Sequence, residues 1–258
     1  MKLRASSYYL RILIMRIAVV SDIHGNLSAF EAVLADLRKT SPDLIFHGGD
    51  LADSGASPVE IVDHIRDLGW PGVAGNTDEM LFRPESLGEF ASQSSAPPSL
   101  WKAISDMAIA TRTLLGEKRI AWLRDLPRTQ IQSQFALVHA SLESLWRAPT
   151  AEATDAELMS AYAALGRPIT VYGHIHRPFI RILSNAQTGD RLVVNAGSVG
   201  LPHDGDRRAS YVLLDGLTAT VRRVGYDIEK ELNGLCNSRL PHSDWIARTL
   251  RAASPQVP

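Results

Sequence analysis

The sequence predicts an α/β fold, and three observations support this. Short apolar runs typical of buried strands recur along the chain, stretches with helical spacing of apolar residues separate the early runs, and polar or glycine-rich residues follow the runs directly. With 258 residues, of which 45% are hydrophobic, the chain is long enough to bury a full core. We therefore expect one compact α/β domain.

The first predicted unit spans residues 17–47. Residues 17–20 form an apolar run that indicates a buried strand, and apolar residues then recur at helical spacing over 27–37 until Ser41-Pro42 ends the helix. Residues 44–46 are a second short strand. A strand, a helix and a second strand predict a parallel pair with a crossover, whose carboxyl ends gather ligands.

The next elements are a helix over 57–68 and a third strand over 70–74, which ends in Gly75-Asn76. Residues 80–128 break the alternation. A loop rich in Ser, Pro and Ala is expected over 90–99, and helical stretches are expected around 101–108 and 120–126. We interpret 80–128 as a helical insertion packed beside the site.

The second half is dominated by strands. Apolar runs at 135–138 and 169–172 flank one amphipathic helix near 156–165, and a hairpin is expected from 179–183 and 191–194 around a turn at 187–190. Residues 210–214 and 219–224 form a last strand pair. The domain is thus predicted to span 15–225, followed by a helical or irregular tail at 226–258 whose last residues, 254–258, are expected to be disordered.

Composition excludes several classes of partner. The formal net charge of −1 and a pI near 6.7 give no basic field, so neither nucleic acid nor a membrane surface is expected as a partner. The single cysteine, Cys236, excludes an internal disulfide and suits a cytoplasmic location. Residues 1–14 are interpreted as an N-terminal extension and not as a signal peptide, because arginines interrupt their short apolar run.

The polar residues that directly follow predicted strands form the main functional signal. Asp22 and His24 are two positions apart at a strand end, where alternate side chains point the same way and can share a metal ion. Oxygen and nitrogen ligands without a thiolate suit two adjacent divalent ions that share one carboxylate, and Asp50 is the natural bridge. The seven predicted ligands are Asp22, His24, Asp50, Asn76, His139, His174 and His176.

These motifs, in this order, resemble the calcineurin-like metallophosphoesterase superfamily, and the most similar branch is the small bacterial and archaeal phosphodiesterase-like one. The resemblance implies a four-layer α/β/β/α sandwich, with two mixed sheets face to face and helices outside. It also implies a first metal held by Asp22, His24, Asp50 and His176, and a second held by Asp50, Asn76, His139 and His174.

The expected reaction is hydrolysis of a phosphoester by a metal-bridging hydroxide. A phosphodiester is expected as the substrate in preference to a phosphomonoester. Manganese is the expected metal, with iron, zinc, nickel and cobalt as alternatives. The substrate is expected to be a small molecule or a nucleotide. Two other functions stay open, namely a phosphomonoesterase of the protein-phosphatase or dinucleotide-polyphosphatase type, and a metal-bound binding module with little catalysis.

One departure from the relatives concerns proton donation to the leaving group. After Gly75-Asn76 many relatives carry a histidine, whereas this chain has Thr77, a poor acid at neutral pH. His203 is the candidate replacement by sequence position. Arg207, Asn195 and Ser198 are candidate substrate-binding residues, because they lie in or after a glycine-flanked turn that can present donors to an anion. Asp53 is either an acceptor that orients a ligand imidazole or a turn residue.

Overall fold

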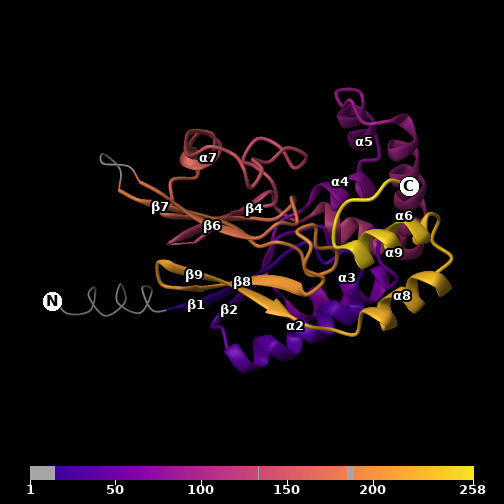
Figure 1. Ribbon diagram of the computed structural model, residues 1–258, viewed down its shortest axis with the longest axis horizontal. Helices are drawn as coiled ribbons and strands as arrows, with labels where there is room; N and C mark the ends of the chain where they lie inside the picture. The colour runs from indigo at the N-terminus through magenta and orange to yellow at the C-terminus, as the bar shows by residue number, and fades with distance from the viewer. Residues whose placement is uncertain (1–14, 133, 185–188) are drawn as a thin grey trace.

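The computed structural model describes residues 15–132, 134–184 and 189–258, and within them two β-sheets lie face to face (Figure 1). The first sheet has the strand order β2-β1-β8-β9. Strand β1 pairs in parallel with β2 and antiparallel with β8, which pairs antiparallel with β9. These strands are β1 (Arg16–Val20), β2 (Leu44–His47), β8 (Ala209–Asp215) and β9 (Thr218–Val224).

The second sheet has the order β3-β4-β5-β7-β6. Its central strands β4, β5 and β7 run parallel, and the two outer strands β3 and β6 are antiparallel to their neighbours. These strands are β3 (Thr129–Ile131), β4 (Phe135–Val138), β5 (Ile169–Tyr172), β6 (Phe179–Leu183) and β7 (Arg191–Asn195). Each sheet is therefore mixed, with parallel strands at its centre or on one side.

Alternation of side chains along the strands builds the core between the layers. In β1, Ile17 and Val19 pack between the sheets with Phe46 and Phe135, whose rings meet edge to face at 5.1 Å. Ala18 and Val20 point to the other side, against helix α2 (Leu27–Thr40). The second sheet covers its outer face with helix α7 (Asp155–Tyr162). The four-layer α/β/β/α sandwich expected from the resemblance is thus confirmed (Figure 1).

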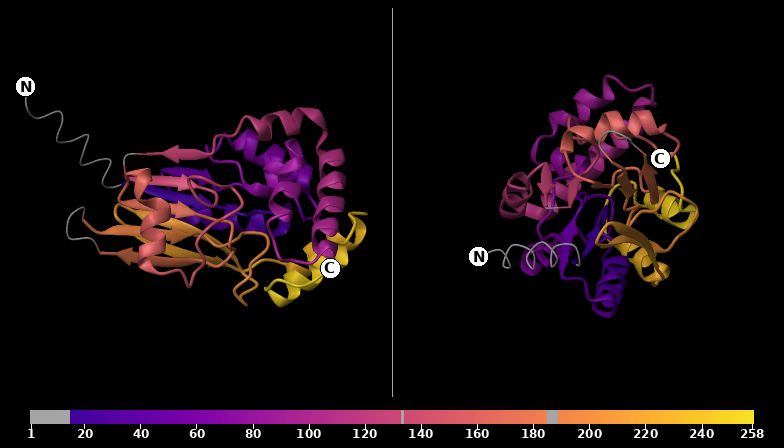
Figure 2. Two further views of the ribbon diagram at one scale, coloured as in Figure 1. Left: turned by 90° about the horizontal axis from the view of Figure 1, so that it is seen from above. Right: turned by 90° about the vertical axis from the view of Figure 1, so that its left-hand side faces the viewer.

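The remaining helices gather at one end of the sandwich, as the two views in Figure 2 show. These helices are α3 (Pro58–Leu68), α4 (Asn76–Phe82), α5 (Glu85–Ala91), α6 (Pro98–Arg124), α8 (Ile228–Asn237) and α9 (Ser243–Ala252); a short 3-10 turn, η1 (Ala163–Leu165), follows α7. Gly116 has φ 68° and ψ 166°, which breaks α6 into the two helical stretches that the sequence predicts. None of the described helices is long and apolar enough to cross a membrane.

Two local expectations differ from the structure. The predicted third strand at 70–74 is reduced to a single bridge between His47 and Gly72, because Pro71 has no N–H to extend the ladder. The predicted disorder at 254–258 is also wrong. The carbonyl of Gln256 accepts a hydrogen bond from Trp245 Nε1 at 2.8 Å, which fastens the end of the chain to α9. The extension at 1–14 and residues 187–188 of the expected turn at 187–190 lie outside the described residues.

Candidate metal centre

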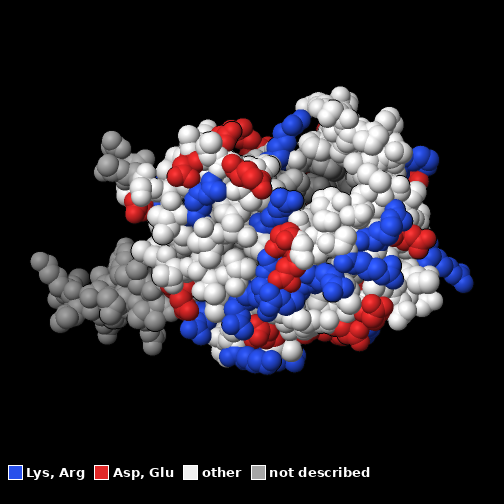
Figure 3. All heavy atoms as spheres, viewed as in Figure 1, with Lys and Arg blue, Asp and Glu red and all other residues white. Residues whose placement is uncertain are grey.

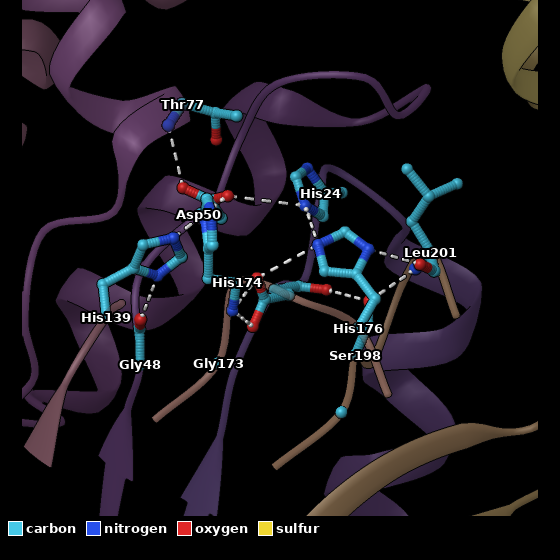
Figure 4. Close-up of polar contacts among 12 residues, drawn as sticks. His24, Gly48, Asp50, Thr77, His139, Gly173, His174, His176, Ser198 and Leu201 are labelled. Atoms are coloured by element: carbon cyan, nitrogen blue, oxygen red, sulfur yellow. Dashed lines mark hydrogen bonds and ion pairs between the residues drawn. The ribbon is translucent and has the colours of Figure 1, made fainter. Parts of the chain in front are cut away.

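The predicted ligands lie at the carboxyl ends of β1, β2, β4 and β5 and at the start of α4. Figure 4 labels His24, Asp50, His139, His174 and His176 among them. Asp22, His24, Asp50 and His176 form a buried group whose ligand atoms all lie within 4.8 Å of one another. His176 Nε2 is 3.1 Å from Asp22 Oδ1 and 3.1 Å from His24 Nε2. Four side chains from three segments far apart in sequence thus enclose one point.

The other three predicted ligands form a second group beside the first. Asn76 Oδ1 lies 2.9 Å from His139 Nε2 and 2.9 Å from His174 Nδ1. Asp50 lies between the groups, because its Oδ2 is 3.5 Å from His139 Nε2 and 3.6 Å from His24 Nε2. One carboxylate oxygen therefore faces both groups, which is the position expected of a bridging ligand.

Backbone carbonyls orient three of the imidazoles. His24 Nδ1 is 3.0 Å from the carbonyl of Asp53, His139 Nδ1 is 2.8 Å from that of Gly48, and His176 Nδ1 is 2.6 Å from that of Leu201. A carbonyl only accepts, so each Nδ1 donates its proton, and in the neutral form each Nε2 has a lone pair directed at the cluster. Oriented imidazoles with adjacent carboxylates are a donor set that fits divalent metal ions.

The backbone of the cluster is strained. Ten non-glycine residues among those described have φ in the left-handed region, and five of them are predicted ligands. These five are Asp22 at 55°, His24 at 50°, Asp50 at 53°, His174 at 66° and His176 at 55°. Such conformations are costly for non-glycine residues and cluster at functional sites, where surrounding structure holds them.

The electrostatics follow from burial and close packing of opposite charges. Burial favours the neutral form of Asp22, but the adjacent His176 outweighs it and holds the pKa of that carboxyl well below its usual range. Burial and the neighbouring His139 lower the pKa of His174 to about 4. Burial likewise lowers the pKa of His139, but the carboxylates of Asp50 and Asp22 raise it overall. The Asp22 carboxylate is therefore held ionised beside the histidines.

Asp78 is a functional residue that the sequence analysis did not identify. Its fully buried carboxylate accepts hydrogen bonds from the backbone N–H of Asp50 at 2.8 Å, Gly75 at 3.0 Å and Leu51 at 3.0 Å. It therefore ties the loop that carries Asp50 to the start of α4, which carries Asn76. The sequence signal for this role is the position of Asp78 as the third residue of a helix. An acidic side chain there accepts a hydrogen bond from the backbone N–H of the N-cap residue.

Asp53 contributes to the site through its backbone. Its carbonyl contacts His24 Nδ1, whereas its carboxylate accepts from Ser54 Oγ at 3.0 Å. The sequence analysis offered the carboxylate as the group that orients an imidazole, and the structure assigns that contact to the carbonyl. Burial raises the pKa of the Asp53 carboxyl to about 7.

The predicted substrate-binding residues do not line the site. Asn195 Nδ2 donates to the carbonyl of Gly173 at 2.6 Å, and Ser198 Oγ donates to that of Asp22 at 2.7 Å. Both side chains are fully buried and brace the ligand-bearing loops, so they have no free group for an anion. Arg207 is exposed and lies outside the cavity beside the metal centre. Asn195 and Ser198 thus support the loops that carry the predicted ligands, and their contact with substrate stays a prediction, as does that of Arg207.

His203 lies where the sequence analysis expected it, beside the cluster. Its ring is 4.4 Å from that of His176, centroid to centroid, and it lines the cavity. Burial, with the nearby His176, lowers the pKa of His203 to about 2. This burial favours the neutral imidazole, and the role of His203 as proton donor stays a prediction. Thr77, the other residue in question, uses its backbone N–H to donate to Asp50 Oδ1 at 2.9 Å.

An α/β/β/α sandwich that gathers buried Asp, Asn and His at its strand ends defines a class of metal-binding phosphoesterases. Residues 15–218 match the family model described as the calcineurin-like phosphoesterase superfamily domain. The chain therefore belongs to the calcineurin-like phosphoesterase superfamily, as the resemblance indicated.

Individual relatives agree with this assignment. The chain is 31% identical over 256 residues to an uncharacterised protein of Methanocaldococcus jannaschii, with 91% of this chain and 96% of that protein aligned. The crystal structure of a metallophosphoesterase from Sphaerobacter thermophilus superposes with a TM-score of 0.76 at 26% identity, covering 93% of this chain and 99% of that one. A bis(5′-nucleosyl)-tetraphosphatase (symmetrical) of Aromatoleum aromaticum is 29% identical over 147 residues, which is 56% of this chain and 50% of that protein.

Proposed function

We propose that this protein hydrolyses phosphodiesters at a centre of two divalent metal ions, with manganese as the preferred metal. The observation that carries the proposal is the position of Asp50 Oδ2 between the two ligand groups, 3.5 Å from His139 Nε2 and 3.6 Å from His24 Nε2. When bound, two such ions polarise the phosphoryl oxygens and lower the pKa of bound water, so that hydrolysis proceeds near neutral pH. The first ion would be held by Asp22, His24, Asp50 and His176, and the second by Asp50, Asn76, His139 and His174.

The chain's own residues orient these ligands. Carbonyl contacts to three Nδ1 atoms fix the imidazole tautomers, and Asp78 and the N–H of Thr77 fix the backbone and carboxylate of Asp50. Such outer contacts keep the donor atoms in place without reorganisation. Neither Thr77 nor the neutral His203 is a strong acid. The proposed substrates are therefore esters whose leaving oxygen needs little help from a protonated side chain.

A preference for diesters over monoesters rests on charge. Among the described residues, none of the side chains that line the cavity beside the metal centre is Lys or Arg. A phosphomonoester carries about −1.5 to −2 charge at pH 7 and is usually bound with arginine or lysine, whereas a diester carries one charge. In Figure 3, Lys and Arg gather over the lower part of this face with Asp and Glu beside them.

The test is release of p-nitrophenol from bis-p-nitrophenyl phosphate by metal-stripped protein with added Mn²⁺. We expect Mn²⁺-dependent turnover that Asp50→Asn and His139→Ala reduce at least 100-fold, whereas His64→Ala on the exposed face of α3 leaves it unchanged. Equal activity of the Asp50 variant and wild type would show that the site is misassigned. Binding of two ions without turnover of any phosphoester would instead indicate a metal-bound binding module.

The relative named as a bis(5′-nucleosyl)-tetraphosphatase supports one alternative, hydrolysis of dinucleotide polyphosphates. The same assay separates it, because diadenosine tetraphosphate, p-nitrophenyl phosphate and bis-p-nitrophenyl phosphate can be compared at equal enzyme concentration. Under our proposal the diester has the highest kcat/KM. Faster turnover of the tetraphosphate would favour the alternative.

A further inference from the structure

A cavity of about 330 Å³ opens beside the metal centre, and its lining has two parts. One part is the ligand cluster itself, including His24, Asp50 and His174. The other part is largely apolar and comes from α4 to α6, the loop after β4, and the end of the chain from α9 onward. A molecule whose phosphoryl group reaches the ligand cluster would therefore place its organic group against the apolar part.

Aromatic rings form one wall of this apolar part. The rings of Phe90 and Trp146 are stacked at 5.1 Å, and Trp101 meets Phe90 edge to face at 5.7 Å. Trp146 is held in place because its Nε1 donates at 2.7 Å to Glu79, a buried carboxylate that also receives Arg128 at 3.0 Å. The wall is thus built from large, oriented rings before any ligand binds.

The end of the chain forms another part of the lining. Trp245, Ile246 and Thr249 of α9 line the cavity together with Pro255 and Gln256. The bond from Trp245 Nε1 to the carbonyl of Gln256 fastens this segment. These residues lie beyond residue 218, where the match to the family ends. This part of the lining is therefore an addition to the part of the chain that matches the phosphoesterase domain.

We propose that this cavity binds a nucleobase, so that the substrate is a phosphoester of a single nucleoside; this rests on the proposed function. Aromatic walls suit the faces of a flat ring such as a nucleobase, because every base can stack on an aromatic side chain. The absence of Lys and Arg from the described lining disfavours a long polyphosphate chain.

The test compares three ligands of Mn²⁺-loaded full-length protein: AMP, ribose 5-phosphate and phenyl phosphate. Binding is measured by tryptophan fluorescence and by inhibition of bis-p-nitrophenyl phosphate hydrolysis. Stacking of one base predicts that AMP binds roughly 5- to 150-fold more tightly than ribose 5-phosphate. AMP should also bind more tightly than phenyl phosphate. Equal binding of AMP and ribose 5-phosphate would overturn the cavity assignment, and equal binding of AMP and phenyl phosphate would overturn the nucleobase.

A pair of variants locates the effect. Trp245→Leu should remove most of the preference for AMP and leave the affinity for ribose 5-phosphate unchanged. The control is Trp70→Leu, which alters a tryptophan packed on Phe30 away from the cavity. This variant should change neither the preference nor the affinity. A Trp245 variant that keeps the full preference would contradict the proposal. Thermal melts identify variants that misfold. The comparison of the three ligands on the wild-type protein does not depend on either variant. Because fluorescence reports binding without turnover, failure of the hydrolase proposal and failure of the nucleobase proposal give different results.

Discussion

Replacing Gly173 with alanine should disrupt the metal centre through a single methyl group. A Cβ at this position would lie 2.2 Å from Asp22 Oδ2 and 2.2 Å from Ser21 Oγ, and contacts under 3.0 Å do not occur for real Cβ atoms. The Asp22 side chain is fully buried, so it cannot swing into solvent. The carboxylate must therefore shift by about 1 Å within a packed interior.

The size of the effect follows from the bonds that this carboxylate makes. Its oxygens accept from the backbone N–H of His174 at 3.0 and 3.2 Å, and Oδ1 lies 3.1 Å from His176 Nε2. A shift of this size should weaken Mn²⁺ affinity about 10- to 100-fold and lower kcat/KM about 100-fold. The overpacking should also lower the free energy of unfolding by about 1–3 kcal/mol.

The assay is calorimetric titration of metal-stripped protein with Mn²⁺, together with urea unfolding and turnover of bis-p-nitrophenyl phosphate. Gly88→Ala is the matched control, because an added Cβ in helix α5 meets nothing within 4 Å. That change should leave Mn²⁺ affinity unaltered and raise the free energy of unfolding by about 0.5–1 kcal/mol. A Gly173→Ala protein that binds Mn²⁺ as tightly as wild type would refute the reasoning.

Two further predictions concern buried carboxylates. Asp78→Asn leaves one oxygen to serve three backbone N–H groups, so the free energy of unfolding in urea should fall by about 2–3 kcal/mol. The control Asp67→Asn, on the exposed side of α3, should change it by less than about 0.5 kcal/mol. Equal losses in the two variants would contradict the role given to Asp78. Burial raises the pKa of Asp53 to about 7, so the folded metal-free protein holds this proton more tightly than the unfolded chain does. The free energy of unfolding should therefore fall as pH rises from about 4 to 7, by at most about 4 kcal/mol. Asp53→Asn should flatten that dependence in urea melts at several pH values, and an unchanged slope would show that Asp53 is not its source.

The sequence identified the seven side chains that the fold brings together, because the signal is local. A strand followed by Asp22 and His24, or by His174 and His176, places polar side chains at a sheet edge whatever the distant packing is. The layers could be expected from the resemblance, and the order of strands confirmed them. Residues whose role depends on one bond across the fold were not identified, as with Asp78 and the carbonyl of Asp53.

Other features that the sequence did not reveal have the same physical origin. Asn195 and Ser198 sit in a turn suited to anion binding, but their polar atoms are consumed by the carbonyls of Gly173 and Asp22, which lie far away in sequence. The end of the chain was expected to be disordered because it is short and rich in Pro and Ser. Its contact with Trp245 depends on how α9 packs, and no local pattern in 254–258 records that.

The central claim is that the seven ligands hold two metal ions that share Asp50. Anomalous X-ray diffraction from crystals grown with Mn²⁺ tests it most directly. We predict two manganese peaks about 3.5–4 Å apart, one beside His24 and His176 and the other beside His139 and His174, with Asp50 between them. A single peak, or two peaks that do not share Asp50, would contradict the account.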